Sequence, residues 1–118
     1  MHCKNFSLID RKDGLGYVLS PAYDLLAVLL TGIDDTNETA MTLSGPGVYD
    51  DETIGGYDRD SFVSVMTESG VDLRYANTII DSIIACKDKW FEIIDISFLD
   101  QKMKSRYMDL INERLGRL

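Results

Sequence analysis

Apolar residues recur every three or four positions between Leu73 and Ile94, and this regularity leaves few choices of fold. Such spacing places the apolar side chains along one side of an α-helix and the polar ones along the other. The sequence therefore predicts a single long amphipathic helix over residues 73–94. Its apolar side is expected to consist of Leu73, Ala76, Ile79, Ile80, Ile83, Ile84, Trp90, Phe91 and Ile94.

A further helix is predicted on either side of this long one. Asp58 or Asp60 can cap a helix over "RDSFVSVMTES", and Gly70 would end it. After a break near Ser97, a last helix runs to Gly116. We expect the main core to consist of Phe62, Met66, Ile80, Ile83, Ile84, Trp90, Leu110 and Ile111.

The segment "FSLIDRKDGLGYVLSP", residues 6–21, is typical of a β-hairpin. Apolar and more polar residues alternate in both halves, and the Asp-Gly pair at 13–14 favours a turn between them. The overlapping stretch "SPAYDLLAVLLTG" predicts a short helix, with Ser20 as the N-cap, Pro21 at the first helical position and Gly32 just past the end.

Residues 33–57 are rich in acidic residues and glycine, and they predict an irregular, mostly exposed connection. Met41–Leu43 is a candidate edge strand, and the acidic cluster 50–52 lacks the ligand spacing of a calcium loop. The fold expected is therefore mainly α with a small N-terminal β-hairpin. It forms a single domain or fragment with three parts, residues 1–32, 33–57 and 58–118.

Composition limits the partners and the location of the chain. The formal net charge of −8 repels nucleic acid and anionic membranes, so neither is an expected partner. The longest apolar stretch, Leu25–Leu30, is too short to cross a bilayer, and no secretory leader is recognised, which favours a cytoplasmic protein. Cys3 and Cys86 lack a metal-ligand spacing and are expected to be reduced thiols.

The first residues, His2, Cys3, Lys4 and Asn5, bring together an imidazole, a thiol, an ammonium and a carboxamide. Residue types alone leave three interpretations open: a metal-binding pair, a cysteine nucleophile activated by the histidine, and a polar loop that leads into a strand. Two adjacent residues supply at most two metal ligands, and neighbours on an extended chain point in opposite directions. Both facts favour the polar loop.

The stretch "HCKNFSLI", followed by the hairpin and "YVLSPAYDLL", resembles the C-terminal part of the HipA-like serine/threonine kinases. That family carries a catalytic loop of the form Asp-x-His-x-x-Asn, then Phe-Ser, a hairpin, and a Tyr-Asp-hydrophobic segment after Ser-Pro or Thr-Pro. The segment "SFLDQKMKSRYMDLINERL" is also similar to the family's C-terminal subdomain. The matching motif positions are His2, Asn5, Phe6, Ser7, Ser20, Pro21, Tyr23 and Asp24.

The resemblance implies the downstream part of a protein-kinase-like C-lobe, with Asn5 and Asp24 as magnesium ligands and His2 as a scaffold residue of the catalytic loop. Kinases use such an amide and carboxylate to hold Mg²⁺ against the phosphates of ATP. The family's catalytic Asp would fall immediately before Met1, and nothing here matches the nucleotide-binding lobe. We therefore expect a fragment truncated just after that Asp, which alone binds neither Mg²⁺ nor ATP well.

The partners that the resemblance implies are the missing N-terminal portion of the kinase, a protein substrate and an antitoxin protein. The alternative hypothesis is a non-enzymatic helical module that binds a partner or regulates a separately encoded kinase half. A stand-alone hydrolase or metal enzyme is disfavoured, because the sequence offers no nucleophile and base pair.

Overall fold

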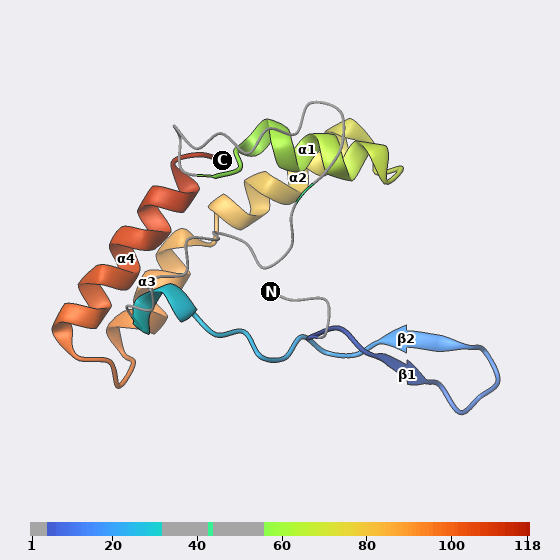
Figure 1. Cartoon of the computed structure of the whole chain (residues 1–118), viewed down its shortest axis with the longest axis horizontal. Helices are drawn as coiled ribbons and strands as arrows, with labels where there is room; N and C mark the ends of the chain where they lie inside the picture. The colour runs from blue at the N-terminus through green and yellow to red at the C-terminus, as the bar shows by residue number, and fades with distance from the viewer. Residues whose placement is uncertain (1–4, 32–42, 44–55) are drawn as a thin grey trace. The chain divides into compact units, whose positions relative to one another are not determined.

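A computed structural model describes residues 5–31, 43 and 56–118 (Figure 1). The backbone packs as two compact units, Met1–Thr42 and Leu43–Leu118. The described residues form four α-helices, one 3-10 helix and one two-stranded sheet, so the expected mainly α fold with an N-terminal hairpin is confirmed. The candidate strand residues Met41 and Thr42 and the acidic cluster 50–52 lie outside the described residues.

The hairpin in the first unit pairs β1 (Leu8–Asp10) antiparallel with β2 (Tyr17–Leu19). Its loop contains three residues in the left-handed region, Lys12, Gly14 and Gly16, with φ of 62°, 77° and 92°. Glycine adopts this region without steric cost, which is why the Asp-Gly pair is a turn signal. The predicted hairpin and its turn are confirmed.

The prediction of a helix that begins at Ser20 and Pro21 is wrong for most of the segment. Only η2 (Val28–Thr31), a single 3-10 turn, forms in this segment. Asp24 has a φ of 56°, a left-handed conformation that a right-handed helix cannot contain. The side chains from Pro21 to Leu26 are exposed, so no buried apolar face stabilises a helix there.

The second unit contains two pairs of packed helices. α1 (Arg59–Glu68) packs on α2 (Leu73–Ile84), and α3 (Lys87–Asp95) packs on α4 (Gln101–Leu115). None of the helices in the described ranges is long and apolar enough to cross a membrane.

Three of these helices begin with an aspartate cap. Asp58 Oδ1 accepts from the Ser61 N–H at 2.9 Å, and Asp72 and Asp100 cap α2 and α4 in the same way. α1 ends where Gly70, with a φ of 90°, follows the last turn. The predicted Asp58 cap and the Gly70 stop are therefore confirmed.

The long helix predicted over residues 73–94 is instead two helices, α2 and α3, with a turn at Ala85 and Cys86. The sequence from 85 to 89 contains no large apolar side chain, so nothing holds the chain on one continuous helical face there. The turn lets the apolar side of α2 pack on α1 and that of α3 pack on α4. The predicted break near Ser97 lies between α3 and α4, as expected.

Burial in the helical unit is concentrated in a few side chains. Of the predicted core, Ile80 is buried, whereas Ile83 is 40% exposed and is a wrong assignment. Ile83 lies in the last turn of α2, just before the turn at Ala85 and Cys86. The remaining predicted core residues are half-buried: Phe62, Met66, Ile84, Trp90, Leu110 and Ile111.

Candidate metal-binding segment

The side chain of Asn5 contacts the main chain of Asp24. Asn5 Nδ2 donates a hydrogen bond to the Asp24 carbonyl oxygen at 3.3 Å, although 19 positions separate the two residues. Asn5 is only 7% exposed. The hairpin therefore brings together the two residues that the sequence suggested as magnesium ligands. That their side-chain oxygens share an ion stays a prediction, and His2 lies outside the described residues.

A second pair of motif residues joins the two sides of the hairpin beside this contact. Ser7 Oγ and Tyr23 Oη are 2.7 Å apart and share a hydrogen bond, and the Ser20 N–H donates to the Ser7 carbonyl at 2.8 Å. The Tyr23 side chain is exposed, and its hydroxyl makes this bond. Ser7 follows Asn5 by two positions and Tyr23 directly precedes Asp24, and these positions were the signal in the sequence that could have predicted the Ser7–Tyr23 hydrogen bond.

Asp24 has an unusual backbone conformation. Among the described non-glycine residues, only Asp24 and Lys12 have a positive φ, and Lys12 lies in the hairpin loop. Aspartate tolerates the left-handed region better than most residues, yet the conformation still costs free energy. Residues held in such conformations cluster at functional sites. The side chain of Asp24 is exposed, and the residue does not belong to a helix.

The chemistry of these two side chains suits a hard cation. An amide oxygen and a carboxylate are ligands that Mg²⁺ accepts, and Asn5 uses its Nδ2 in the bond to Asp24, which leaves Oδ1 as its acceptor atom. In the described ranges no group of three or more His, Cys, Asp or Glu side chains could hold a metal. Two ligands fit a Mg²⁺ ion that completes its shell with water and phosphate oxygens.

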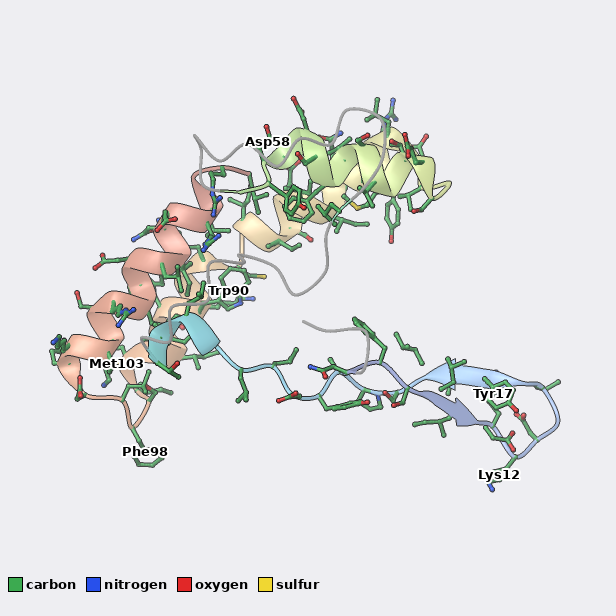
Figure 2. The ribbon with its side chains drawn as sticks, viewed as in Figure 1. Lys12, Tyr17, Asp58, Trp90, Phe98 and Met103 are labelled. Atoms are coloured by element: carbon green, nitrogen blue, oxygen red, sulfur yellow. The ribbon has the colours of Figure 1, made fainter. Side chains whose placement is uncertain are left out.

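The helical unit contains an apolar pocket of about 380 Å³ between α3 and α4. Trp90, one of its lining residues, lies on α3, and Phe98 projects from the turn between the two helices (Figure 2). The pocket has no carboxylate, imidazole or amine in its lining, and its polar groups are the Tyr107 hydroxyl and the Trp90 indole N–H. Its lining residues are Trp90, Ile93, Ile94, Tyr107 and Ile111.

Two groups in the helical unit have shifted pKa values with structural causes. The Ser61 N–H and hydroxyl donate to Asp58 and hold the pKa of its carboxyl below the ordinary value of 3.8. Burial, with a smaller contribution from the neighbouring Arg117 charge, lowers the pKa of Arg114. Both groups lie at helix ends, so the shifts reflect capping and packing.

The resemblance to HipA-like kinases depends on the motif residues, all of which except His2 lie within residues 5–31. No protein-family model matches this sequence, and neither does any curated protein. The hydrogen bonds of Asn5, Ser7, Ser20 and Tyr23 are therefore the structural observations that bear on the motif.

Proposed function

We propose that this chain is the C-terminal part of a HipA-like serine/threonine protein kinase, in which Asn5 and Asp24 hold the magnesium ion that accompanies ATP. The hydrogen bond from the Asn5 side chain to the Asp24 main chain carries this proposal. Protein kinases bind their metal through an amide and a carboxylate that come from separate segments. A buried amide and an exposed carboxylate residue meet here at the base of a hairpin.

Each residue of this segment has a task in the proposal. Asn5 Oδ1 and the Asp24 carboxylate would hold the ion, while Asn5 Nδ2 keeps its side chain against the Asp24 carbonyl. The bond between Ser7 and Tyr23 holds the two sides of the hairpin at a fixed spacing. Bound Mg²⁺ would neutralise charge on the nucleotide phosphates.

The proposal assigns the catalytic Asp and the nucleotide-binding lobe to polypeptide outside residues 1–118. Mg²⁺ keeps several waters and relies on phosphate oxygens to complete its shell, so an amide and a carboxylate alone bind it weakly. We therefore expect the 118-residue chain by itself neither to bind Mg-ATP appreciably nor to transfer phosphate. An antitoxin protein is the further partner that the resemblance suggests for the whole kinase.

The test compares this chain with a longer protein that adds whatever polypeptide the reading frame encodes upstream of Met1. Calorimetric titration measures Mg-ATP binding, and a radiolabelled assay measures phosphate transfer to serine or threonine. We expect binding and transfer from the longer protein alone, and loss of transfer in its Asp24→Ala variant. Asp109→Ala, which removes an exposed carboxylate on α4, is the matched control and should leave transfer unchanged.

Two outcomes would contradict the proposal. A longer protein that neither binds Mg-ATP nor transfers phosphate would exclude a kinase. Micromolar Mg-ATP binding by the 118-residue chain alone, abolished by Asp24→Ala, would indicate a complete small kinase rather than a part of one.

A non-enzymatic helical module is the second candidate function. It is favoured by the apolar surface of the helical unit, where the pocket between α3 and α4 is open and Ile96 and Phe98 are exposed in the turn between them. The titration above separates the two candidates, because a module of this kind would bind no Mg-ATP with or without the upstream sequence.

A further inference from the structure

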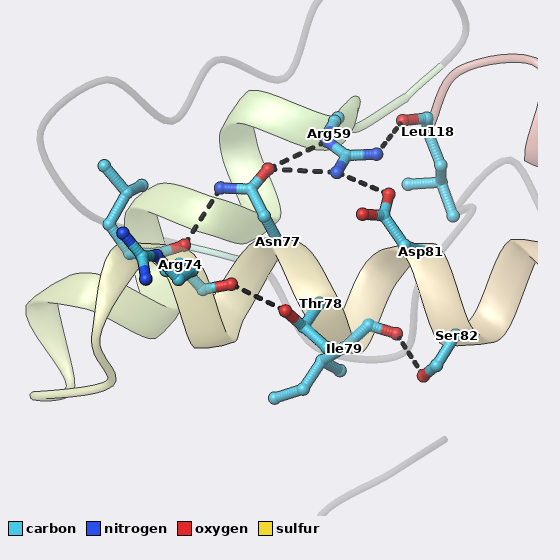
Figure 3. Close-up of polar contacts among 9 residues, drawn as sticks. Arg59, Arg74, Asn77, Thr78, Ile79, Asp81, Ser82 and Leu118 are labelled. Carbon is cyan, nitrogen blue, oxygen red and sulfur yellow. Dashed lines mark hydrogen bonds and ion pairs between the residues drawn. The ribbon is translucent and has the colours of Figure 1, made fainter.

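The side chain of Arg59, the first residue of α1, binds two other parts of the helical unit (Figure 3). Its Nε and Nη2 donate to Asn77 Oδ1 at 3.1 and 3.0 Å, and Nη2 also donates to Asp81 Oδ1 at 2.7 Å. Its Nη1 donates to the main-chain oxygen of Leu118 at 3.1 Å. The main-chain N–H of Arg59 donates to the Arg117 carbonyl at 3.0 Å.

These bonds connect the two helix pairs of the unit. Asn77 and Asp81 belong to α2, within the first pair, whereas Arg117 and Leu118 follow α4, the last helix of the second pair. The chain itself joins the pairs at the turn between α2 and α3. The Arg59 bonds add a noncovalent connection between α1 and the residues after α4.

We infer that Arg59 acts as a strap that couples the two helix pairs, so that α1–α2 and α3–α4 unfold as one cooperative unit. Local helix pairs can open independently when few interactions join them. Arg59 binds Asn77 within the first pair and Leu118 after α4, so this one side chain links α2 to the residues that follow the second pair. Loss of the Arg59 side chain therefore removes the bond to Leu118 together with the polar bonds from α1 to α2, while the apolar packing within each pair remains.

Arginine suits this position because its planar guanidinium presents five N–H donors in fixed directions. Here the donors reach a side-chain amide, a side-chain carboxylate and the main-chain oxygen of Leu118 together. The Asp81 side chain is 65% exposed, so its ion pair with Arg59 is screened by solvent and salt. The coupling thus depends chiefly on the bonds to Asn77 and Leu118.

Amide hydrogen exchange of the full chain, measured by NMR, tests the inference. In the unmodified protein, the slowest amides of α2 and α4 should have equal protection factors, because both exchange through unfolding of the whole unit. In Arg59→Ala these factors should separate by about tenfold, the size of an ordinary coupling between contacting residues. Protection that falls by one common factor in both helices, or does not fall, would overturn the inference.

Urea unfolding supplies a second measurement on the same proteins. Trp90 is the single tryptophan and lies on α3, so its fluorescence reports on the second pair, whereas far-UV circular dichroism reports on all helices. The two transitions should coincide in the unmodified protein and separate in Arg59→Ala. Coincident transitions in Arg59→Ala would overturn the inference.

Two variants serve as controls. Arg74→Ala removes another arginine from the same unit, an exposed one on α2, and should leave the transitions coincident. Asn77→Ala removes the acceptor that Nε and Nη2 share, so it should separate the transitions even if Arg59→Ala does not fold. Coincident transitions in Asn77→Ala, or separated ones in Arg74→Ala, would contradict the role of the Arg59 network.

Discussion

The hydrogen bond between Ser7 Oγ and Tyr23 Oη is the residue-scale feature that we expect to stabilise the hairpin base. Tyr23→Phe removes only the hydroxyl and should cost about 0.5–1.5 kcal/mol of local stability. Exchange of the Ser20 amide hydrogen, which is bonded to the Ser7 carbonyl, measures this loss. Tyr17→Phe, at an exposed tyrosine of β2, is the control and should leave that exchange rate unchanged.

A double variant decides whether this bond causes the effect. If Ser7 and Tyr23 act through one hydrogen bond, Ser7→Ala combined with Tyr23→Phe should speed the exchange no more than either change alone. Fully additive effects would show that the two hydroxyls contribute separately.

The Asp58 cap should make the stability of α1 dependent on pH. Because the folded-state pKa of Asp58 lies below the ordinary 3.8, the carboxylate stabilises the fold above that value. This contribution is lost as the pH falls through the folded-state pKa. Asp58→Ala should therefore cost about 1 kcal/mol at pH 7 and much less near pH 2. Urea unfolding at both pH values measures the difference.

Asp58→Asn is the matched variant for this measurement. Asparagine keeps the capping oxygen and does not titrate, so its cost should be small at pH 7 and should become a gain near pH 2, where the unmodified protein has lost its ionised cap. A cost of Asp58→Ala that did not change with pH would contradict an ionised cap.

At the scale of the helices, the turn at Ala85 and Cys86 changes which side chains stabilise the fold. Ile80 is 3% exposed, so Ile80→Ala should cost about 2–5 kcal/mol of unfolding free energy. Ile83 is 40% exposed, and Ile83→Ala should cost clearly less. Urea midpoints from circular dichroism compare the two variants. Equal losses would place Ile83 inside the core after all.

The helix ends were predictable from sequence because their causes are local. The Asp58 cap and the Gly70 stop depend on side-chain and backbone preferences within one turn. The division of residues 73–94 into two helices was not predictable in this way, because each half packs on a different partner helix. Periodicity indicates that one face of a helix is apolar, but it does not indicate which other element packs on that face.

At the scale of the whole molecule, the net charge of −8 opposes the binding of an anionic nucleotide. In the proposed kinase, Mg²⁺ would offset this repulsion at the phosphates. In the longer protein, Asp24→Ala should reduce phosphate transfer by about 10²-fold or more, since it removes a charged ligand. Asn5→Ala should reduce it less, and excess Mg²⁺ should partly restore that variant. Transfer assays over a range of Mg²⁺ concentrations measure both effects.

From the sequence, the candidate site could be predicted only as residue types that follow one another in a given order, without their geometry. The motif placed an amide before the hairpin and a carboxylate after it, and the turn at 13–14 predicted that the chain doubles back between them. The helix assigned to residues 21–31 hid the left-handed conformation of Asp24, because Ser20 and Pro21 are good helix-start signals. Such start signals do not indicate a left-handed residue three positions after Pro21.

The φ of 56° at Asp24 has a consequence for how mutational data on this residue are interpreted. Alanine at this position loses the carboxylate and also strains the backbone, whereas glycine loses the carboxylate and relieves the strain. The effect common to both substitutions therefore measures the chemistry of the carboxylate. The difference between them measures how much conformational energy the protein stores at one residue. A comparison of Asp24→Gly with Asp24→Ala thus separates the effect of losing the carboxylate from the effect on folding stability. Asp24→Ala alone cannot separate these two effects.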